Sequence, residues 1–409
     1  MRRRDLLALT AAAALAPLAA PALAAAPQTA GAPKRLVVVL LRGAVDGLNV
    51  VIPYADEAYY AARPTIAVQR PEAGEGAGLA LDDHFALHPA LAALMPLWRE
   101  RQLAFVHAAG SSDPTRSHFD AQLFVENGTP GRHATADGWM NRLLAALPGP
   151  RGPTDAIAIG PTLPAILRGP LTVANLPLGQ AAGHQLAIDR PEIASAFDRL
   201  YAGGGPLGRA YREGRAARAE LLGQIGPEPQ AADGGSLPAN GFPAQAARLA
   251  HLLSRNRRTR LAFVALDGWD THVRQGGAQG QLAERLQPLG DGLAALAHGL
   301  GSDWNDTVVV VVSEFGRTVR ENGDGGTDHG HGNAIWVLGG SVRGGRVYGE
   351  WPGLSHAQLY EGRDLGVTTD FRSVLASVGE RHLRLSDRAI AAVFPGLPPA
   401  GSEIAGIVG

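Results

Sequence analysis

The stretch SEFGRTVRENGDGGTDHGHG, residues 313–332, carries more ionisable side chains than a surface turn needs. It follows five consecutive valines and ends with an aspartate and two histidines set among glycines. Carboxylate and imidazole groups together suit Zn, Mn, Fe, Mg or Ca, depending on geometry. The segment therefore predicts a metal site, and the alternative interpretation is a solvated glycine-rich loop.

Further candidate ligands follow other apolar runs, in the motifs RGAVDGLN and DGWDTH. The predicted metal ligands are Asp46, Asp267, Asp270, His272, Glu314, Asp328, His329 and His331. For each aspartate in a motif the alternative is a turn built on an Asp-Gly pair. Two metals ~3.5–4 Å apart can clamp the attacking and leaving oxygens of a phosphoryl or sulfuryl transfer. We expect one or two divalent ions, with Zn, Mn, Mg and Ca all open.

A nucleophile is predicted within SSDPTRSHFDAQ, which follows an apolar run and opens a helix. The candidates are Ser112 and Ser117. For Ser117 the alternative is a helix N-cap, because Asp120 stands three residues later as in a capping box. His118 is open between a ligand, an acid or base, and a packed side chain.

Two arginines are predicted to bind an anion. Arg116 precedes the expected helix start, where free N–H groups also favour negative charge. Arg317 lies just behind Glu314 and offers a second guanidinium for an oxyanion. His84, His88 and His107 lack such surroundings in the sequence and are assigned structural roles.

These residues need a scaffold that brings distant parts of the chain together. Near-continuously apolar runs, typical of strands covered on both faces, occupy residues 35–43, 102–110, 155–160, 260–268, 306–314 and 333–340. Helix-like segments lie between them, at 88–102, 117–128 and 280–301. The alternation predicts a doubly wound α/β fold with a mainly parallel sheet and helices on both faces. Ligands bind at the carboxyl ends of such strands, so we expect the candidate ligands to converge there.

Composition excludes several classes of protein. The chain has 409 residues, 45% hydrophobic residues and a formal net charge of −1, which disfavours disorder and nucleic-acid binding. Cysteine is absent, so disulfides and thiolate metal sites are excluded.

The N-terminus, MRRRDLLALT, fits a twin-arginine signal followed by an Ala-rich run. We expect a signal peptide over residues 1–26 with cleavage after Ala24 or Ala26; the alternative is a retained membrane anchor. Residues 27–409 are expected to form one α/β domain, without a transmembrane segment, in the periplasm or outside the cell. A helical insertion is expected at about 190–258, with a mobile Gly/Pro-rich loop at 226–241.

The motifs RGAVDGLNVVIPY, RSHFDAQ, DGWDTH and SEFGRT…GTDHGHGNA occur in this order behind the predicted signal. Together they resemble an exported bacterial family known as domain of unknown function fifteen-oh-one, over about residues 35–400. The resemblance implies a fold similar to the alkaline phosphatase and sulfatase superfamily. Members of that superfamily hydrolyse phosphate and sulfate monoesters with one or two metals.

Positions that match the superfamily acquire implied roles. Asp46 resembles its first strand-end ligand, Asp267 or Asp270 with His272 resemble the ligands of one metal, and His331 resembles its last histidine ligand. SDPTR is similar to the sulfatase pattern and would put Ser112 at the modified position, whereas RSHF points to Ser117.

The sequence departs from the superfamily pattern directly after the run of five valines. Where the superfamily commonly shows Asp-His-Gly, this chain has Glu314, Phe315 and Gly316. Phe315 cannot bind a metal, so a second metal site is expected to be weakened, to use Asp328 or His329, or to be lost.

The predicted function is therefore an exported metal-dependent hydrolase of phosphate or sulfate esters, with a small anionic ester as substrate. The alternative is a catalytically inactive protein of the same fold that acts with an envelope partner in binding or assembly.

Overall fold

The computed structural model describes residues 33–133, 135–176, 191–203, 205–224, 237–398, 404 and 406–409. Ala32–Gly409 forms one compact unit. The expected signal peptide, 1–26, and residues 226–236 of the expected mobile loop lie outside the described residues.

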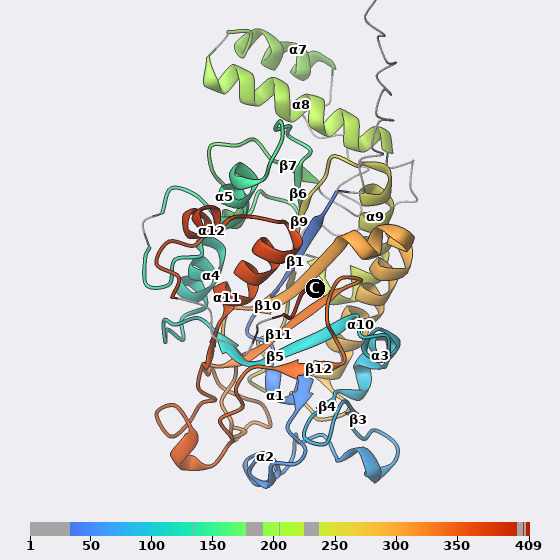
Figure 1. Ribbon diagram of the computed structural model, residues 1–409, viewed down its shortest axis with the longest axis vertical. Coiled ribbons are helices and arrows are strands. Elements are labelled where there is room, and N and C mark those ends of the chain that lie inside the picture. Colours follow the sequence, from blue (N-terminus) through green and yellow to red (C-terminus); the bar gives the residue numbers. More distant parts are fainter. Residues whose placement is uncertain are drawn as a thin grey trace, which may run out of the picture. The chain divides into compact units, whose positions relative to one another are not determined.

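A single large sheet organises the molecule, with strand order β12-β5-β11-β10-β1-β9-β6-β7 (Figure 1). All the predicted strands are present. The strands of this path are β1 (Arg35–Arg42), β5 (Leu103–Gly110), β6 (Ala156–Ile159), β7 (Ala174–Leu176), β9 (Leu261–Asp267), β10 (Thr307–Ser313), β11 (Asn333–Gly339) and β12 (Arg346–Tyr348). Short strands β8 (Leu237–Pro238) and β13 (Thr369–Asp370) pair with β9 and β5, and a small second sheet joins β2 (Val51–Ile52), β4 (Ala86–Leu87) and β3 (Leu79–Ala80).

The direction of the strands determines at which edge of the sheet the loop with the candidate ligands lies. β10, β1, β9, β6 and β7 are mutually parallel, whereas β11 runs antiparallel to both β10 and β5. A strand that returns through a loop without a crossover must run antiparallel to the strand before it. The segment 314–332 is that loop, so it stays at the carboxyl ends of β10 and β1.

Helices cover both faces of the sheet, which confirms the predicted doubly wound, mainly parallel architecture. On β1, Val37, Val39 and Leu41 belong to one core cluster, and Leu36, Val38 and Leu40 to the other, as the period of two requires. The first face packs on α3 (Met95–Arg99), α9 (Phe242–Arg255) and α10 (Gln281–Leu300), and the second on α4 (His118–Asn127), α5 (Trp139–Ala146), α11 (Phe371–Ser377) and α12 (Asp387–Val393) (Figure 1).

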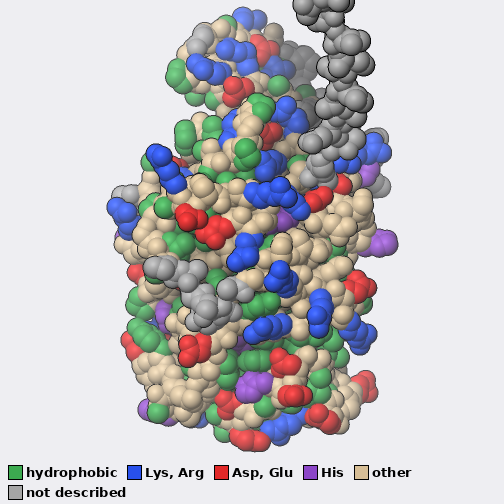
Figure 2. All heavy atoms as spheres, in the orientation of Figure 1, with side chains coloured by type: hydrophobic (Ala, Val, Ile, Leu, Met, Phe, Trp, Pro, Cys, Tyr) green, Lys and Arg blue, Asp and Glu red, His purple; other side chains and the backbone are tan. Residues whose placement is uncertain are grey.

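The remaining helical segments are short or belong to the predicted insertion. They are α1 (Gly47–Val50), α2 (Glu57–Ala62), α7 (Pro191–Leu200) and α8 (Pro206–Gln224). Short 3-10 segments are η1 (Pro71–Ala73), η2 (Pro89–Leu94), η3 (Ala165–Leu167), η5 (Ala239–Gly241), η6 (Gly301–Asp306) and η7 (His356–Gln358), and η8 (Val378–His382) is a π-helix. Among the described residues, no helix is both long and apolar enough to cross a membrane. Figure 2 shows basic and acidic side chains scattered over the same face, in line with the near-neutral charge.

Three buried histidines lie outside the candidate metal ligands and are satisfied by structural hydrogen bonds, as expected for His88 and His107. In His107, Nε2 donates to the Val51 carbonyl (2.9 Å) and Nδ1 accepts from the Ala108 N–H (2.9 Å). His88 bonds the Gly277 carbonyl and the Ala90 N–H in the same way. His382 contacts the Arg35 carbonyl (3.0 Å). Each ring is therefore neutral and satisfied.

These histidines predict loss of stability in acid. Burial lowers the pKa of His88, His107 and His382 to about 4. Because the unfolded chain takes up these protons near its ordinary pKa of about 6.5, their contribution is complete above that pH and is lost as the pH falls towards 4. The expected slope is up to about 1.4 kcal/mol per pH unit for each histidine. Urea unfolding between pH 7 and pH 4.5 measures it, and His107→Gln should flatten the slope; an unchanged slope would contradict the assignment.

Candidate metal centre

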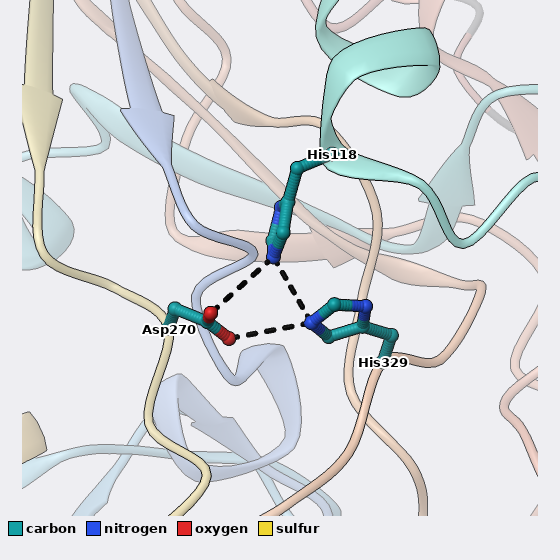
Figure 3. Close-up of side chains that lie close together, drawn as sticks. All are labelled: His118, Asp270 and His329. Atoms are coloured by element: carbon teal, nitrogen blue, oxygen red, sulfur yellow. Dashed lines mark hydrogen bonds and ion pairs between the residues drawn. The ribbon is translucent and has the colours of Figure 1, made fainter.

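One group of side chains in the described part of the chain has the geometry of a metal site. The ligand atoms of His118, Asp270 and His329 all lie within 4.8 Å of one another (Figure 3). His118 is the first residue of α4, Asp270 follows β9, and His329 lies in the loop between β10 and β11. Three distant segments thus meet beside the carboxyl ends of the central strands.

The separations suit a single ion. His118 Nε2 lies 3.0 Å from His329 Nε2 and 3.6 Å from Asp270 Oδ2, and His329 Nε2 lies 3.4 Å from Asp270 Oδ1. His272 lies next to these three, because its Nε2 is 3.0 Å from both His329 Nε2 and Asp270 Oδ1. Ligands 2.0–2.1 Å from a tetrahedral ion lie ~3.3 Å apart, which is the range found here.

Each of the three histidines is held through its other ring nitrogen. The Nδ1 contacts are His118 with Glu314 Oε1 (2.8 Å), His272 with Asp328 Oδ1 (3.1 Å) and His329 with the Arg116 carbonyl (2.9 Å). A carboxylate or carbonyl oxygen only accepts, so each Nδ1 carries the proton and each Nε2 lone pair faces the group. This arrangement recurs around metal-binding histidines in proteins.

The donor set fits a bound cation on its own chemistry. Two imidazole lone pairs 3.0 Å apart repel each other unless a proton or a cation lies between them. A divalent ion would satisfy the Nε2 atoms of His118 and His329 together with the Asp270 carboxylate. Nitrogen-rich sets of this kind favour Zn and its neighbours over Mg or Ca.

Glu314, predicted as a metal ligand, contacts His118 at the ring nitrogen that faces away from the group. It is buried, and its Oε1 accepts from His118 Nδ1, Gln122 Nε2 (2.9 Å) and the Gly43 N–H (2.8 Å). Burial alone would raise the pKa of Glu314, but these hydrogen bonds hold it below its usual value. The hydrogen bond to Glu314 in turn raises the pKa of His118 against the effect of burial. Glu314 therefore positions His118, and the ligand role predicted for it is corrected.

Asp328 is corrected in the same sense. Its Oδ1 accepts from His272 Nδ1 and from Asn322 Nδ2 (3.2 Å). Asp328 therefore contacts the ring nitrogen of His272 that points away from the group. Hydrogen bonds from Asn322 and then His272 hold the pKa of Asp328 below its usual range. Burial lowers the pKa of His329, which keeps that ring neutral.

Arg317 also differs from its prediction as an anion-binding residue. It is 1% exposed, and its Nε and Nη1 donate to the Ala44 and Thr327 carbonyls. Its Nη2 donates to Asp270 Oδ1 (2.5 Å) and to the Gly43 carbonyl. Burial would raise the pKa of Asp270, but Arg317 keeps it below its usual value. Arg317 thus orients Asp270 and is not available to a substrate.

Arg116 is likewise occupied by acidic partners. Its Nη2 donates to Asp364 Oδ2 (2.6 Å) and Glu361 Oε2 (2.7 Å), and its Nε reaches the same Asp364 oxygen (3.0 Å). What Arg116 contributes to the group is its carbonyl, which fixes His329. The predicted role of its guanidinium as an anion clamp is therefore not supported by this geometry.

Three predicted ligands do not join the group. The Asp46 carboxylate is buried against Arg63, with contacts of 2.5 and 3.0 Å, and accepts from Gln275 Nε2 (2.6 Å). Asp267, at the end of β9, lines a separate cavity of about 100 Å³. The His331 ring packs on Tyr360, with centroids 4.8 Å apart. The expectation that Asp46, Asp267 and His331 converge with Glu314 and His272 is wrong, because Asp46 pairs with buried Arg63 and His331 packs on Tyr360.

Phe315, which departs from the superfamily pattern, forms the apolar wall of the group. It is 2% exposed, its ring stacks on His118 (centroids 4.9 Å apart) and it packs against His329 (5.2 Å). The aromatic ring limits the orientations of both imidazoles. Its place next to Glu314 is therefore explained by packing.

The two predicted nucleophiles lie in the chain next to this group. Ser117 is the N-cap of α4 and accepts from the Asp120 N–H (3.5 Å). Ser112 is exposed in the bend that follows β5. Neither hydroxyl hydrogen-bonds to any of the three histidines or to Asp270, so a nucleophilic role for either remains a prediction.

His118 lies at the centre of the group, although the sequence left its role open. The available signal was the motif RSHF at a helix start that follows a buried strand. That signal could not separate a ligand from a packed ring, because Glu314, which orients His118, is 196 positions away.

The chain matches one protein family in sequence and is distantly similar to several solved structures. A family model described as "Protein of unknown function (DUF1501)" matches residues 33–394, and no curated protein sequence matches. Among solved structures, the C-terminal periplasmic domain of EcEptC from Escherichia coli is similar at 11% identity and a TM-score of 0.39, covering 91% of this chain and 89% of that one.

Two further solved structures cover less. A protein in the alkaline phosphatase superfamily from Vibrio parahaemolyticus is 12% identical with a TM-score of 0.34, and the match covers 78% of this chain and 64% of that one. The PsFucS1 sulfatase from Pseudoalteromonas sp. is 12% identical with a TM-score of 0.37, over 77% and 64%. These likenesses are distant, so the chemistry of this chain has to be derived from its own side chains.

Proposed function

The chain belongs to the DUF1501 family, whose description assigns no reaction, and we propose that it is an exported metal-dependent hydrolase of phosphate or sulfate esters. The observation that carries the proposal is the convergence of two Nδ1-anchored histidines, His118 and His329, with Asp270. A divalent cation held there supplies Lewis acidity towards an ester oxygen.

The residues of the chain favour an anionic ester. Histidines that bind an ion are neutral, so among His118, His329 and Asp270 only Asp270 offsets the double positive charge and the occupied site stays cationic. Asp270 is 44% exposed at its side chain and His272 is 39% exposed, which leaves the group accessible from solvent. Arg317 and Glu314 hold Asp270 and His118 in place without competing for the substrate. Ser117, next to His118 in the chain, is our candidate nucleophile, with Ser112 as the alternative.

Metal analysis followed by an activity screen tests the proposal. Protein purified without chelator should contain about one equivalent of a divalent metal, and the loaded protein should hydrolyse at least one member of a panel of phosphate and sulfate monoesters and diesters. Activity should disappear on chelation and return when the metal is added back. A metal-loaded protein that is inert towards the whole panel would overturn the hydrolase proposal.

One observation favours a second candidate, a metal-binding envelope protein without catalysis. The guanidinium groups of Arg116 and Arg317 are occupied by Asp364, Glu361 and Asp270, so neither is free to bind the transferred group. The same screen separates the candidates, because this second candidate predicts metal without turnover.

Export by the twin-arginine route is part of the proposal and is supported by the motif RRRDLL. The N-terminus of protein recovered from the producing cells should lie near Ala25 to Pro27. Recovery of the intact N-terminus from the envelope would contradict cleavage and favour an anchor.

We expect Glu314→Gln to weaken metal binding by about 10- to 100-fold, the usual effect of removing a carboxylate that orients a metal-binding histidine. The amide keeps an acceptor for His118 Nδ1 but removes the negative charge that makes the ring a better donor. Competition with a chromogenic chelator measures the change. Asp324→Asn is the matched control, because Asp324 is an exposed acid of the same loop whose carboxylate makes no hydrogen bond or ion pair among the described residues. Equal losses in both variants would contradict the role of Glu314.

A further inference from the structure

A second cavity lies beside the candidate metal centre and has a different chemical character. Its volume is about 310 Å³, and its walls come from α2, from residues 319–320 and from residues 354–363. We call it the Arg320 pocket. Ligand sites in proteins typically measure about 300–1,000 Å³, so it has room for a small molecule.

Basic side chains line this pocket without acidic ones. Arg320, His356 and Arg363 contribute to its wall, and none of the described residues that line it is Asp or Glu. Arg320 is exposed and forms no ion pair with any described residue. Arg363 is partly neutralised, because its Nε and Nη2 contact the two Asp364 oxygens at 2.9 and 3.1 Å. Arg320 is therefore the main unbalanced charge facing the cavity.

The rest of the wall is apolar and belongs to the core. Leu354 and Val319 are buried in the same hydrophobic cluster as Ala62, and Leu359 packs against that cluster. An unpaired guanidinium beside aliphatic side chains suits a ligand with one oxyanion and one short apolar group. A purely inorganic anion would leave the apolar wall unused.

The pocket is preformed. Buried Arg63 donates to the Val319 carbonyl (2.9 Å), and the Glu321 N–H donates to the Ala62 carbonyl (3.0 Å), so the wall formed by residues 319–320 is fixed to the end of α2. On the opposite wall, Ser355 and Gln358 form a reciprocal cap around η7. Ordering these walls costs little on binding, because the free protein already holds them.

We propose that the Arg320 pocket binds a small organic oxyanion, a phosphate, sulfate or carboxylate attached to a short aliphatic or aromatic group. Arg320 would contact the anion, and Leu354 and Leu359 would cover the apolar part. Arg363 links the pocket to the metal centre, because its Nη2 also donates to the His329 carbonyl (2.7 Å). The inference goes beyond the proposed hydrolase function and does not depend on it, since the pocket contains none of the metal-binding side chains.

Titration calorimetry with the full chain, freed of metal, tests this inference with hexyl phosphate as the probe. Hexyl sulfate and hexanoate show which anionic group is preferred. Inorganic phosphate carries the anion without the apolar chain, and hexanol carries the chain without the anion. We expect at least one of the hexyl anions to bind more tightly than either half. Arg320→Ala should weaken that binding by at least about 10-fold, the usual effect of losing a charged hydrogen bond.

Matched variants distinguish binding in this pocket from binding at the metal centre or elsewhere on the surface. Leu359→Ser should weaken the hexyl anion but leave inorganic phosphate unchanged, and Arg343→Ala should have no effect, because that exposed arginine lines a different hollow. His329→Ala should bind the hexyl anion as the unaltered protein does. The inference fails if no hexyl anion binds, if Arg320→Ala binds it with unchanged affinity, or if binding requires the metal and is lost in His329→Ala.

Discussion

Replacing His329 with alanine is expected to abolish metal binding while the fold remains intact. Its Nε2 lies 3.0 Å from both His118 Nε2 and His272 Nε2 and 3.4 Å from Asp270 Oδ1, so it touches every other donor of the group. Removing a residue that merely orients a ligand costs about 10- to 100-fold in affinity, and removing this central ligand should cost more than ~100-fold.

Metal content and thermal unfolding measure the effect together. A metal at 100 times its dissociation constant stabilises the folded protein by about 2.7 kcal/mol, and the His329 variant should lose that increment. With chelator present, the two proteins should unfold at similar temperatures, because His329 is only partly buried.

His331→Ala is the most informative control, because it changes the same residue type two positions later. The His331 ring packs on Tyr360, and burial lowers the pKa of His331. The side chain therefore contributes to packing next to Tyr360. We expect the His331 variant to keep its metal. His298→Ala, at an exposed position on α10, should change neither metal content nor stability. A His329 variant that retains stoichiometric metal, or a His331 variant that loses it, would contradict the assigned centre.

Replacing Asp46 with asparagine is expected to destabilise the protein by about 3–5 kcal/mol, whether or not metal is present. Arg63 is completely buried, and Asp46 is the only carboxylate that contacts it among the described residues. Without that charge the guanidinium stays buried and uncompensated, which is one of the most costly changes in a protein interior. The loss of the acceptor for Gln275 adds to the effect.

Urea unfolding of the metal-free protein at pH 7 measures this change. Glu57→Gln is the control, because Glu57 forms an exposed ion pair with Arg70 and should contribute no more than about 1 kcal/mol. The double variant Asp46→Asn with Arg63→Met should recover part of the loss, since it removes both buried charges. If Asp46→Asn lowered stability only in the presence of metal, Asp46 would be a ligand after all.

The sequence by itself determined the architecture. Runs such as VVVVV are typical of strands covered on both faces, so hydrophobicity alone predicted β1, β5, β6, β9, β10 and β11 and the doubly wound fold, but not β7, β12 or the shorter strands. It also predicted candidate ligands in the loop between β10 and β11 and in DGWDTH, because both segments place imidazole and carboxylate groups after predicted strands. Asp270, His272 and His329 were all candidates on this ground, and the structure places their side chains together.

Only the tertiary structure decided what each of these acids and bases does. Asp46, Asp270, Asp328 and Glu314 are similar as sequence signals, since each is a carboxylate in a polar segment that comes after a predicted strand. Their roles differ because of what they contact. Arg63 neutralises Asp46. Asp328 and Glu314 instead accept hydrogen bonds from the Nδ1 atoms of His272 and His118.

The physical reason is that a ligand is defined by a shared point in space. His118 meets His329 across 211 positions of the chain, and Arg317 fixes Asp270 across 47. Hydrophobic periodicity reports which face of an element is buried, but it carries no information on which polar groups meet across elements. That choice depends on the geometry of hydrogen bonds between segments, which exists only once the sheet has brought their ends together.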